Sequence, residues 1–360
     1  MQNKVLLIGP FPGPAKGLSL SNFVVRKGLQ ERGWNVKTIN TENEGKIDVA
    51  FGKFSLAKLS FLKTYLEIYK VISFNKIYIT IGITFFGVLK YAPFIILGKI
   101  LGKELTVHLH SNHLKTEFKN LSKIKKYLFH GVLRLFDKGI VISKSQRDNL
   151  TPFLQENKIF EIHNFFEQNL IKDENLLISS KDYSEIKLFY LSNLLKEKGI
   201  NDLLNAITGL NKEGYFPKVK IAGNKVSDND LTKLLLNVKN VEYIGVVQNQ
   251  SKIDLLAWGN VFCLPTYFKM EGMPISIIEA MAFNNLILTT DHAGIKDLCG
   301  DEHAIYCEKN NFKDLAIKIK EISYNLPEMK KMAINNGIFV RKNLTEKNFI
   351  DNIEKTILSK

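Results

Sequence analysis

The sequence predicts an α/β protein made of two doubly wound domains, each built on a parallel sheet. Short apolar runs alternate with amphipathic, helix-like stretches along the 360 residues, which is the pattern of βαβ units. The alternation is interrupted by a polar stretch, residues 167–185, and then starts again. A chain of this length can bury two cores of ordinary size, so we expect two domains joined by this linker.

The expected strands fall into two series. The first comprises residues 4–9, 35–40, 76–82, 104–110 and 139–143. The second comprises residues 186–192, 218–223, 240–245, 261–265 and 286–290. Helix-like stretches such as residues 21–33 lie between strands. Ligands of such domains bind at the carboxyl ends of the strands, so we expect the functional site in a cleft there.

Residues 77–102 are the most hydrophobic stretch and raise the question of a membrane span. Lys90 lies in the middle, Pro93 follows it, and several glycines interrupt the run. We therefore predict a strand, a loop and a helix of a buried core. The apolar run near the N-terminus is expected to be the first strand, and not a secretory signal.

The net charge of +14 is unevenly placed. Residues 1–165 hold 25 Lys and Arg against 11 Asp and Glu, whereas residues 166–360 hold 25 of each kind. Such a basic half is attracted to anionic surfaces, either nucleic acid or a membrane. The base-stacking aromatic patterns of nucleic-acid modules are absent, so we expect no nucleic-acid partner.

Residues 113–136 are predicted to form one basic amphipathic helix. Apolar residues recur at helical spacing, and lysines occupy the other faces; the apolar set is Leu114, Phe118, Leu121, Ile124, Leu128, Val132 and Leu135. Such a helix can lie on anionic lipid, with each basic residue near the surface adding roughly 1 kcal/mol. A helix packed on the first domain with a solvated lysine face fits the pattern equally well. The charge asymmetry favours membrane contact.

No metal or cofactor site is expected. The three cysteines, Cys263, Cys299 and Cys307, lack the spacing of metal ligands, as do the seven histidines, so reduced thiols of a cytosolic protein are expected. Asp228 and Asp230 form an Asp-x-Asp pair in a polar loop, which we interpret as solvated. The first loop lacks the Gly-Lys-Ser/Thr ending of a P-loop.

The stretch "EGMPISIIEAMA" places Glu271 and Glu279 on either side of an expected helix start. Pro274 suits the first helical position, and backbone N–H groups from Gly272 to Ile275 would then be available to bind a phosphate. Glu279 lies about a turn and a half into the helix and can accept two hydroxyl bonds from a ribose diol. The spacing therefore suits a nucleotide diphosphate joined to a sugar, with Glu271 on the sugar side.

This stretch resembles the Glu-x7-Glu signature of retaining family-4 glycosyltransferases. Other segments follow in the order of that family: the Gly/Pro-rich first loop, "KELTVHLHSN", "IFEIHNFFE", "FYLSNLLKEKGINDLLNAI" and "LTTDHAGIKDL". The resemblance covers nearly the whole chain. It implies the GT-B fold, in which two Rossmann-like domains with parallel sheets face each other across a cleft. The implied divisions are a basic acceptor-binding domain, 1–167, a nucleotide-sugar-binding domain, 168–345, and a C-terminal helix, 346–360, that can pack back on the first domain.

The resemblance also implies roles for single residues. Glu271 would bind hydroxyls of the donor sugar, Glu279 would bind the ribose, and Lys198 would stabilise charge on the leaving diphosphate. His110, with His108 as the alternative, would bond a sugar hydroxyl or a phosphate. The remaining substrate-binding positions are the backbone of Gly272, Met273, Pro274 and Ile275, the loop glycine Gly17, and Asn193.

Five residues at three places in the sequence depart from the family pattern. Ser192 and Asn193 stand where the family usually has Gly-Arg, so a guanidinium on the diphosphate is missing and Asn193 or Lys196 replaces it only in part. Asp297 stands where Glu is usual, and His292-Ala293 replaces a position with a Gly pair. These changes affect the contacts with the donor more than the reaction.

The sequence thus predicts a retaining, metal-independent hexosyltransferase-type enzyme that needs no cofactor beyond its nucleotide-sugar substrate. Its expected acceptor is a glycan or a lipid-linked glycan of surface polysaccharide synthesis. Its expected location is cytoplasmic, peripheral at the inner face of the cell membrane, with the basic N-terminal domain on anionic lipid. A nucleotide-sugar epimerase of the same fold and a noncatalytic nucleotide-sugar-binding relative are the alternatives.

Overall fold

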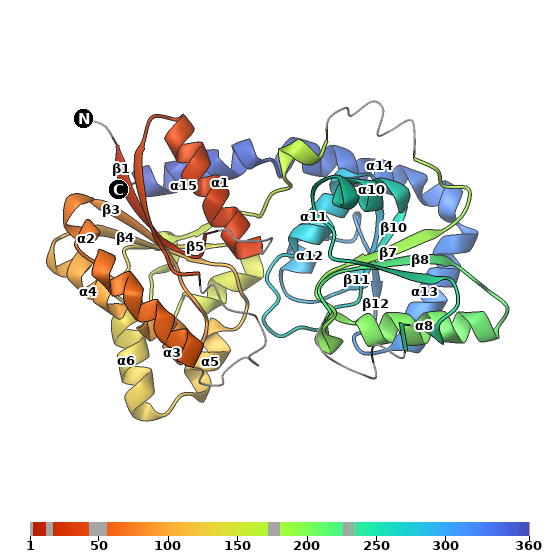
Figure 1. Ribbon diagram of the computed structural model, residues 1–360, viewed down its shortest axis with the longest axis horizontal. Coiled ribbons are helices and arrows are strands. Elements are labelled where there is room, and N and C mark those ends of the chain that lie inside the picture. The colour runs from red at the N-terminus through yellow and green to blue at the C-terminus, as the bar shows by residue number, and fades with distance from the viewer. Residues whose placement is uncertain are drawn as a thin grey trace. The chain divides into compact units, whose positions relative to one another are not determined.

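The computed structural model describes residues 3–11, 17–42, 56–171, 181–225, 231, 234–235 and 237–359. The chain forms two compact units (Figure 1). Unit 1 comprises Met1–Asn164 and Lys347–Lys360, and unit 2 comprises Phe165–Glu346. Each unit contains a six-stranded sheet in which all paired strands are parallel. The predicted fold class, with two doubly wound α/β domains, is confirmed.

The sheet of unit 1 has the strand order β2-β1-β3-β4-β5-β6. Its strands are β1 (Lys4–Gly9), β2 (Asn35–Asn40), β3 (Lys76–Thr80), β4 (Glu104–Leu109), β5 (Lys138–Val141) and β6 (Ile159–Glu161). The central strands are continuous apolar runs because helices cover both faces of a doubly wound sheet. Strand order reverses between β1 and β3. Val5 of β1 pairs with Val36 of β2 on one side and with Lys76 of β3 on the other.

Helices cover both faces of this sheet. Figure 1 shows α1 and α15 on one side, and α2, α3, α4 and α6 on the other. The helices are α1 (Gly17–Glu31), η1 (Leu56–Glu67), α2 (Lys70–Ser73), α3 (Phe85–Leu89), α4 (Ala92–Ile100), α5 (Leu114–Asn120), α6 (Lys123–Leu133), η2 (Lys144–Asn149), η3 (Glu156–Lys158) and α15 (Glu346–Leu358), where η marks a 3-10 helix. The hydrophobic stretch 77–102 forms β3, α3 and α4, that is, a strand followed by two short helices where one helix was predicted. Within the described residues, no helix combines the length and the apolar character needed to cross a membrane.

The prediction of one helix over residues 113–136 is wrong. Leu121 and Ser122 are extended, with ψ angles of 150° and 161°, and they separate α5 from α6. Asn and Ser favour helix ends because their side chains compete for backbone hydrogen bonds, and both occur at this break. The break turns α6 so that Phe129, Val132 and Leu133 are buried, whereas Ile124 and Leu128 are exposed.

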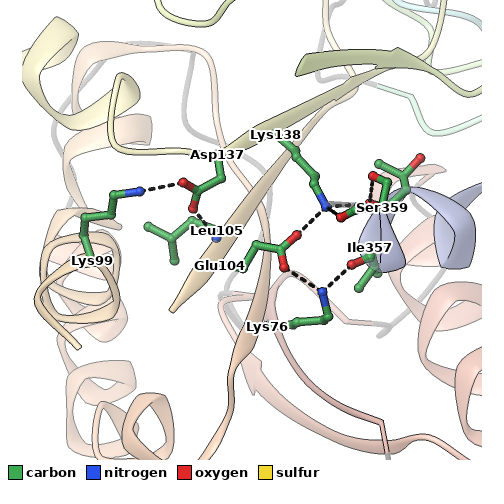
Figure 2. Close-up of polar contacts among 9 residues, drawn as sticks. Lys76, Lys99, Glu104, Leu105, Asp137, Lys138, Ile357 and Ser359 are labelled. Carbon is green, nitrogen blue, oxygen red and sulfur yellow. Dashed lines mark hydrogen bonds and ion pairs between the residues drawn. The ribbon is translucent and has the colours of Figure 1, made fainter. Parts of the chain in front are cut away.

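The last helix is anchored on unit 1 by lysines at the amino ends of the strands (Figure 2). Lys76 Nζ donates to the carbonyl of Ile357 and to Glu104, both at 2.6 Å. Lys138 Nζ donates to the carbonyls of Thr356, at 3.0 Å, and Ser359, and it also pairs with Glu104. Cations at a helix C-terminus satisfy its last carbonyls and complement the helix dipole. This arrangement fixes the end of α15 to the sheet.

The sheet of unit 2 has the order β12-β11-β10-β7-β8-β9. Its strands are β7 (Lys187–Leu191), β8 (Lys218–Ala222), β9 (Val241–Gly245), β10 (Val261–Leu264), β11 (Leu286–Thr290) and β12 (Ile305–Cys307). Its helices are η4 (Gln168–Leu170), η5 (Lys196–Lys198), α8 (Ile200–Lys212), α10 (Asn249–Trp258), α11 (Ile275–Ala282), α12 (Gly294–Cys299), α13 (Phe312–Tyr324) and α14 (Leu326–Asn343). In Figure 1, α8 and α13 lie on one face of the sheet, and α10, α11 and α14 lie on the other.

Strand order in unit 2 reverses between β7 and β10, the first and fourth strands of the unit. Loops on opposite faces of the sheet diverge at such a switch point, and this opening receives ligands in doubly wound sheets. The loop after β7 contains Asn193 and Lys198, and the loop after β10 contains Glu271. The topology therefore brings these predicted site residues to one edge of the sheet.

Candidate functional site

The turn between the two predicted glutamates leads into α11. Pro274 precedes the helix as its N-cap residue, with φ −63° and ψ 121°, so the prediction that it occupies the first helical position is off by one residue. The helix starts at Ile275. The Ile277 N–H donates to the Pro274 carbonyl at 3.2 Å, whereas the N–H groups of Ile275 and Ser276, at the first two helical positions, have no partner within the helix. Together with the helix dipole they can bind an anion, and Gly272 and Met273 lie next to them in the chain.

Glu271 and Lys198 form a buried ion pair in front of this helix. Lys198 Nζ lies 2.6 Å from Glu271 Oε2, with side-chain exposures of 14% and 8%. Thr266 Oγ1 donates to the same carboxylate oxygen at 3.1 Å. Lys198 Nζ also lies 5.0 Å from the centroid of the Phe268 ring, which is a cation–π distance. The carboxylate predicted to bind the sugar and the cation predicted to bind the diphosphate are thus adjacent.

Gly199 explains how Lys198 reaches this position. Its φ of 79° is left-handed, and a Cβ there would lie 2.2 Å from the carbonyl oxygen of Pro265. Only glycine permits this conformation and this close approach together. The Tyr267 N–H donates to the Glu197 carbonyl at 2.8 Å, which joins η5 to the loop after β10. The Lys-Gly sequence therefore positions Lys198 by backbone packing.

Glu279 is buried inside α11 and is paired with a lysine that the sequence analysis missed. Lys252 of α10 pairs with Glu279 Oε1, and its Nζ lies 3.1 Å from Glu167 Oε1. Burial raises the pKa of Glu279 from 4.5 to about 6, although Lys252 acts to lower it. Lys252 lies on a helix of weak amphipathicity, and no local motif marks it as a site residue.

Asn193, which replaces the expected arginine, lies exposed in the loop after β7. Its backbone carbonyl accepts bonds from the Tyr190 hydroxyl at 3.0 Å and from the Leu195 N–H at 2.8 Å. These bonds form the turn that carries the chain from β7 into η5. An amide side chain at this place can donate hydrogen bonds but contributes no charge.

The loop after β11 packs on the turn that precedes α11. His292 Nε2 lies 2.8 Å from the Phe268 carbonyl oxygen, and the Gly294 N–H donates to the Gly272 carbonyl at 3.1 Å. Ala293, between them, has φ 52° and ψ −138°, a region that glycine adopts far more readily than alanine. His292 and Ala293, which depart from the family pattern, therefore lie in the loop that supports the turn before α11.

In unit 1, the predicted histidines lie together at the end of β4. The ring centroids of His108 and His110 are 3.9 Å apart, and the Tyr78 hydroxyl bonds His108 Nδ1. Burial lowers the pKa of His110 to about 3, and that of His108 well below its usual range. Both imidazoles are therefore neutral at pH 7, and their Nε2 atoms are buried without a hydrogen-bond partner. Gly17 begins α1, directly after residues outside the described ranges.

In the part of the chain that the structure describes, no group of three or more His, Cys, Asp or Glu side chains could hold a metal ion. Asp228 and Asp230 lie outside the described residues. All three cysteines are buried and unbridged, and burial raises the pKa of Cys299 and Cys307 to about 12. Thiols with such pKa values are poor nucleophiles at neutral pH.

Comparisons with known proteins agree with this geometry. Residues 172–338 match the family described as glycosyl transferases group 1. The chain is 26% identical over 197 residues to the capsular polysaccharide biosynthesis glycosyltransferase CapM of Staphylococcus aureus, covering 51% of each chain. It is 27% identical over 188 residues to the N,N'-diacetylbacillosaminyl-diphospho-undecaprenol alpha-1,3-N-acetylgalactosaminyltransferase of Campylobacter jejuni, covering 52% of this chain and 46% of the relative. The matches thus span about half the length of these relatives.

Among solved structures, HepE of Anabaena in complex with UDP and glucose has a similar fold. The TM-score is 0.74 at 14% sequence identity, with 100% of both chains covered. At this identity the similarity shows the fold alone, and it extends over both six-stranded sheets. Most of unit 2 thus matches the group 1 glycosyl transferases, and together with the two parallel sheets and the glycosyltransferase relatives this match supports a glycosyltransferase of the family-4 type with the GT-B fold.

Proposed function

We propose that the protein transfers a sugar from a nucleotide diphosphate sugar to a hydroxyl of a glycan or lipid-linked acceptor, with retention and without a metal ion. The observation that carries the proposal is the Lys198–Glu271 ion pair, buried in front of α11 at the switch point of a parallel sheet. It places a cation and a carboxylate next to free helix N–H groups, which suits a diphosphate joined to a polyol.

The donor is proposed to bind in three parts. The diphosphate lies against the first turn of α11, close to Gly272, Met273 and Ile275, and Lys198 pairs with it. The ribose diol bonds Glu279, whose ionised carboxylate accepts two hydroxyl bonds. Glu271 accepts bonds from the hydroxyls of the sugar. Asn193 contributes an amide donor in place of a guanidinium.

The residues named above stabilise the departing diphosphate during transfer. Negative charge grows on it as its bond to the anomeric carbon breaks, and Lys198 and the helix N–H groups offset that charge. The acceptor hydroxyl attacks the oxocarbenium-like centre from the same face, and the leaving phosphate accepts its proton. His110, neutral at pH 7, bonds a sugar hydroxyl or the phosphate, and Gly17 lets the first loop approach.

The acceptor and the location follow from charge and from relatives. CapM is named for capsular polysaccharide biosynthesis, and the Campylobacter relative is named for a diphospho-undecaprenol acceptor. The excess positive charge of residues 1–165 suits anionic lipid. We therefore place the protein at the cytoplasmic face of the membrane, in surface polysaccharide synthesis.

Donor binding can be tested with the purified protein and a panel of nucleotide sugars. A true donor raises the melting temperature by mass action, because it binds only the native state. Hits are then incubated with lipid-linked and soluble glycan acceptors, and the anomeric configuration of the product is read by NMR. Retained configuration in a glycosylated product supports the proposal. Free nucleotide with a modified sugar and no acceptor would reveal an epimerase, and binding without turnover would reveal a noncatalytic relative.

A further inference from the structure

The outer helical layer of unit 1 carries an unusual number of exposed apolar side chains. Leu66, Phe86, Ile100 and Tyr127 have exposures of 79%, 75%, 75% and 81%. Eleven exposed large apolar residues lie between positions 62 and 128, out of 19 in the whole described chain: Leu62, Leu66, Tyr69, Ile72, Phe86, Ile96, Ile100, Leu101, Ile124, Tyr127 and Leu128. We call this set the apolar face. Single exposed apolar residues are normal, but a gathering of this size marks an interaction surface.

The elements that carry the apolar face pack side by side. Helix α2 contacts α4, α4 contacts α6, and α6 contacts α3, on the side of the sheet opposite α1 and α15 (Figure 1). Lys103 Nζ donates to the Ile72 carbonyl at 2.8 Å, which joins α2 to the end of α4. Lys125 Nζ lies 5.4 Å from the centroid of the Phe85 ring, which joins α6 to α3. The ring centroids of Tyr65 of η1 and Phe94 of α4 are 5.6 Å apart, so η1 also joins this layer. The exposed side chains therefore share one layer.

The same layer is strongly basic. Residues 56–136 hold 13 Lys and Arg against three Asp and Glu, which accounts for most of the net charge of +14. Exposed lysines flank the apolar residues along the layer: Lys63, Lys99, Lys119, Lys123 and Lys125. Protein–protein interfaces are depleted of lysine, and two copies meeting through this layer would bring like charges together. Anionic phospholipid headgroups match the charge, and the acyl chains below them match the apolar side chains.

We propose that the apolar face is a membrane-docking surface whose side chains enter an anionic bilayer while the flanking lysines bind its headgroups. This inference deepens the proposed function, on which it rests for the lipid-linked acceptor. The predicted single helix over 113–136 does not carry the docking by itself, because its buried face includes Phe129, Val132 and Leu133. Residues of η1, α2, α3 and α4 contribute as much exposed apolar surface as α6 does.

Depth of insertion can be measured with an environment-sensitive fluorophore. All three native cysteines are buried, so an introduced surface cysteine is labelled selectively. The nitrobenzoxadiazole dye is placed at Tyr127→Cys or, as a matched control, at Ile317→Cys of unit 2, which is 54% exposed in the native chain. With phosphatidylglycerol-containing vesicles, the dye at 127 should brighten and shift to shorter wavelength, and the dye at 317 should not. Equal responses at the two sites would overturn the proposal.

The contribution of apolar contact is tested by sedimentation with vesicles. The variant Leu66→Asn/Ile100→Asn/Tyr127→Asn keeps all charges and should lower partitioning to phosphatidylglycerol vesicles at least about tenfold, since three apolar side chains no longer insert. The control Phe216→Asn/Ile317→Asn/Ile338→Asn changes exposed residues of unit 2 and should bind as the native chain does. Phosphatidylcholine vesicles should bind weakly in every case.

Other outcomes of these experiments identify other roles for the face. Vesicle binding that the first triple variant leaves unchanged would refute insertion. A dimer in light scattering that the same variant dissociates would show that the face joins two copies. The vesicle assay contains no nucleotide sugar, so its result is independent of catalysis. Conversely, transfer to a soluble acceptor reports on the proposed function when vesicle binding fails.

Discussion

Lys198 Nζ lies 2.6 Å from Glu271 Oε2, which joins two side chains 73 residues apart in the sequence. Both are largely buried, and Thr266 Oγ1 donates to the same carboxylate oxygen. A donor diphosphate would compete with Glu271 for this lysine. In the proposed mechanism, the pair holds both groups in position before the donor arrives, and Lys198 then turns toward the negative charge that forms during transfer.

Replacing Glu271 should abolish sugar transfer while the fold is retained. Glu271→Gln keeps the side-chain volume but weakens the bonds to the sugar hydroxyls. Because the sugar is then misplaced, kcat/KM should fall at least about 100-fold. Glu271→Ala should lose more. Steady-state transfer measures the loss, and affinity for the nucleoside diphosphate alone should change little. Glu242→Gln, an exposed carboxylate on β9, is the control. Transfer at the native rate in Glu271→Ala would remove this residue from the proposed mechanism.

Replacing Lys198 should weaken binding of the nucleoside diphosphate itself. A charge-assisted hydrogen bond contributes about 1.5–3 kcal/mol, so Lys198→Met should raise the Kd about 10- to 100-fold. Calorimetry gives this value directly, and Lys212→Met, at an exposed position of α8, should leave it unchanged. Native affinity in Lys198→Met would mean that this lysine binds only Glu271.

Donor affinity should depend on pH through Glu279. Its pKa of about 6 lies above the ordinary 4.5, so the carboxylate proposed to accept the ribose hydroxyls is lost as pH falls through about 6. The Kd for the nucleoside diphosphate should therefore rise below that pH in the native chain. Glu279→Gln should bind more weakly at pH 7 and lack this step. Because the phosphates of the ligand titrate equally for both proteins, the difference between the two profiles isolates Glu279. Identical profiles would contradict the assignment.

Lys252 should act as a positioning residue for Glu279. Its cation lowers the pKa of that carboxyl, so Lys252→Met should move the step in the affinity profile above pH 6. Lys220→Met removes a lysine that lies 3.7 Å from the exposed Glu242 and serves as the control. If Lys252 has only a structural role, Lys252→Met should lower the melting temperature and leave the pH of the affinity step unchanged.

Ala293→Gly should stabilise unit 2. Alanine at φ 52° and ψ −138° costs about 1–3 kcal/mol, and the greater freedom of glycine in the unfolded chain returns about 0.4–1 kcal/mol of that. A net gain of about 1 kcal/mol should raise the melting temperature by about 2–4 °C. Ala257→Gly, on the exposed side of α10, should lower it, because glycine destabilises a helix interior. A lower melting temperature for Ala293→Gly would show that the conformation is not strained.

Local patterns were sufficient to predict most of the fold. Strands β1 and β2 have the predicted bounds, and β1 is a continuous buried apolar run whose ends are easy to locate. The short edge strands β6 and β12 were not predicted, since three residues each are too few to show a period. The break at Leu121 and Ser122 was missed because the prediction followed the long apolar stripe. In the structure, the helix-ending character of Asn120 and Ser122 outweighs that stripe.

The candidate site was only partly predictable for a different reason. The two glutamates and their helix start are a contiguous motif, so their relative placement could be derived from helix geometry. Lys252 pairs with Glu279, which is 27 residues away in the sequence. Position 199 must be glycine because the Pro265 carbonyl, from another loop, leaves no room for a Cβ. Contacts of this kind depend on how strands are ordered in the sheet. Single-sequence patterns carry no information about that order beyond the general rules of topology.

The anchoring of α15 bears on how the protein folds during synthesis. Unit 2 is one continuous segment, Phe165–Glu346, whereas the core of unit 1 includes Phe349, Ile350 and Ile353 from the last stretch of the chain. Domains fold as units while the ribosome adds residues from the N-terminus onward. Most of unit 1 is translated first, but the helix whose carbonyls bind Lys76 and Lys138 is made only after unit 2. The second unit to be made is therefore the first that can complete its core.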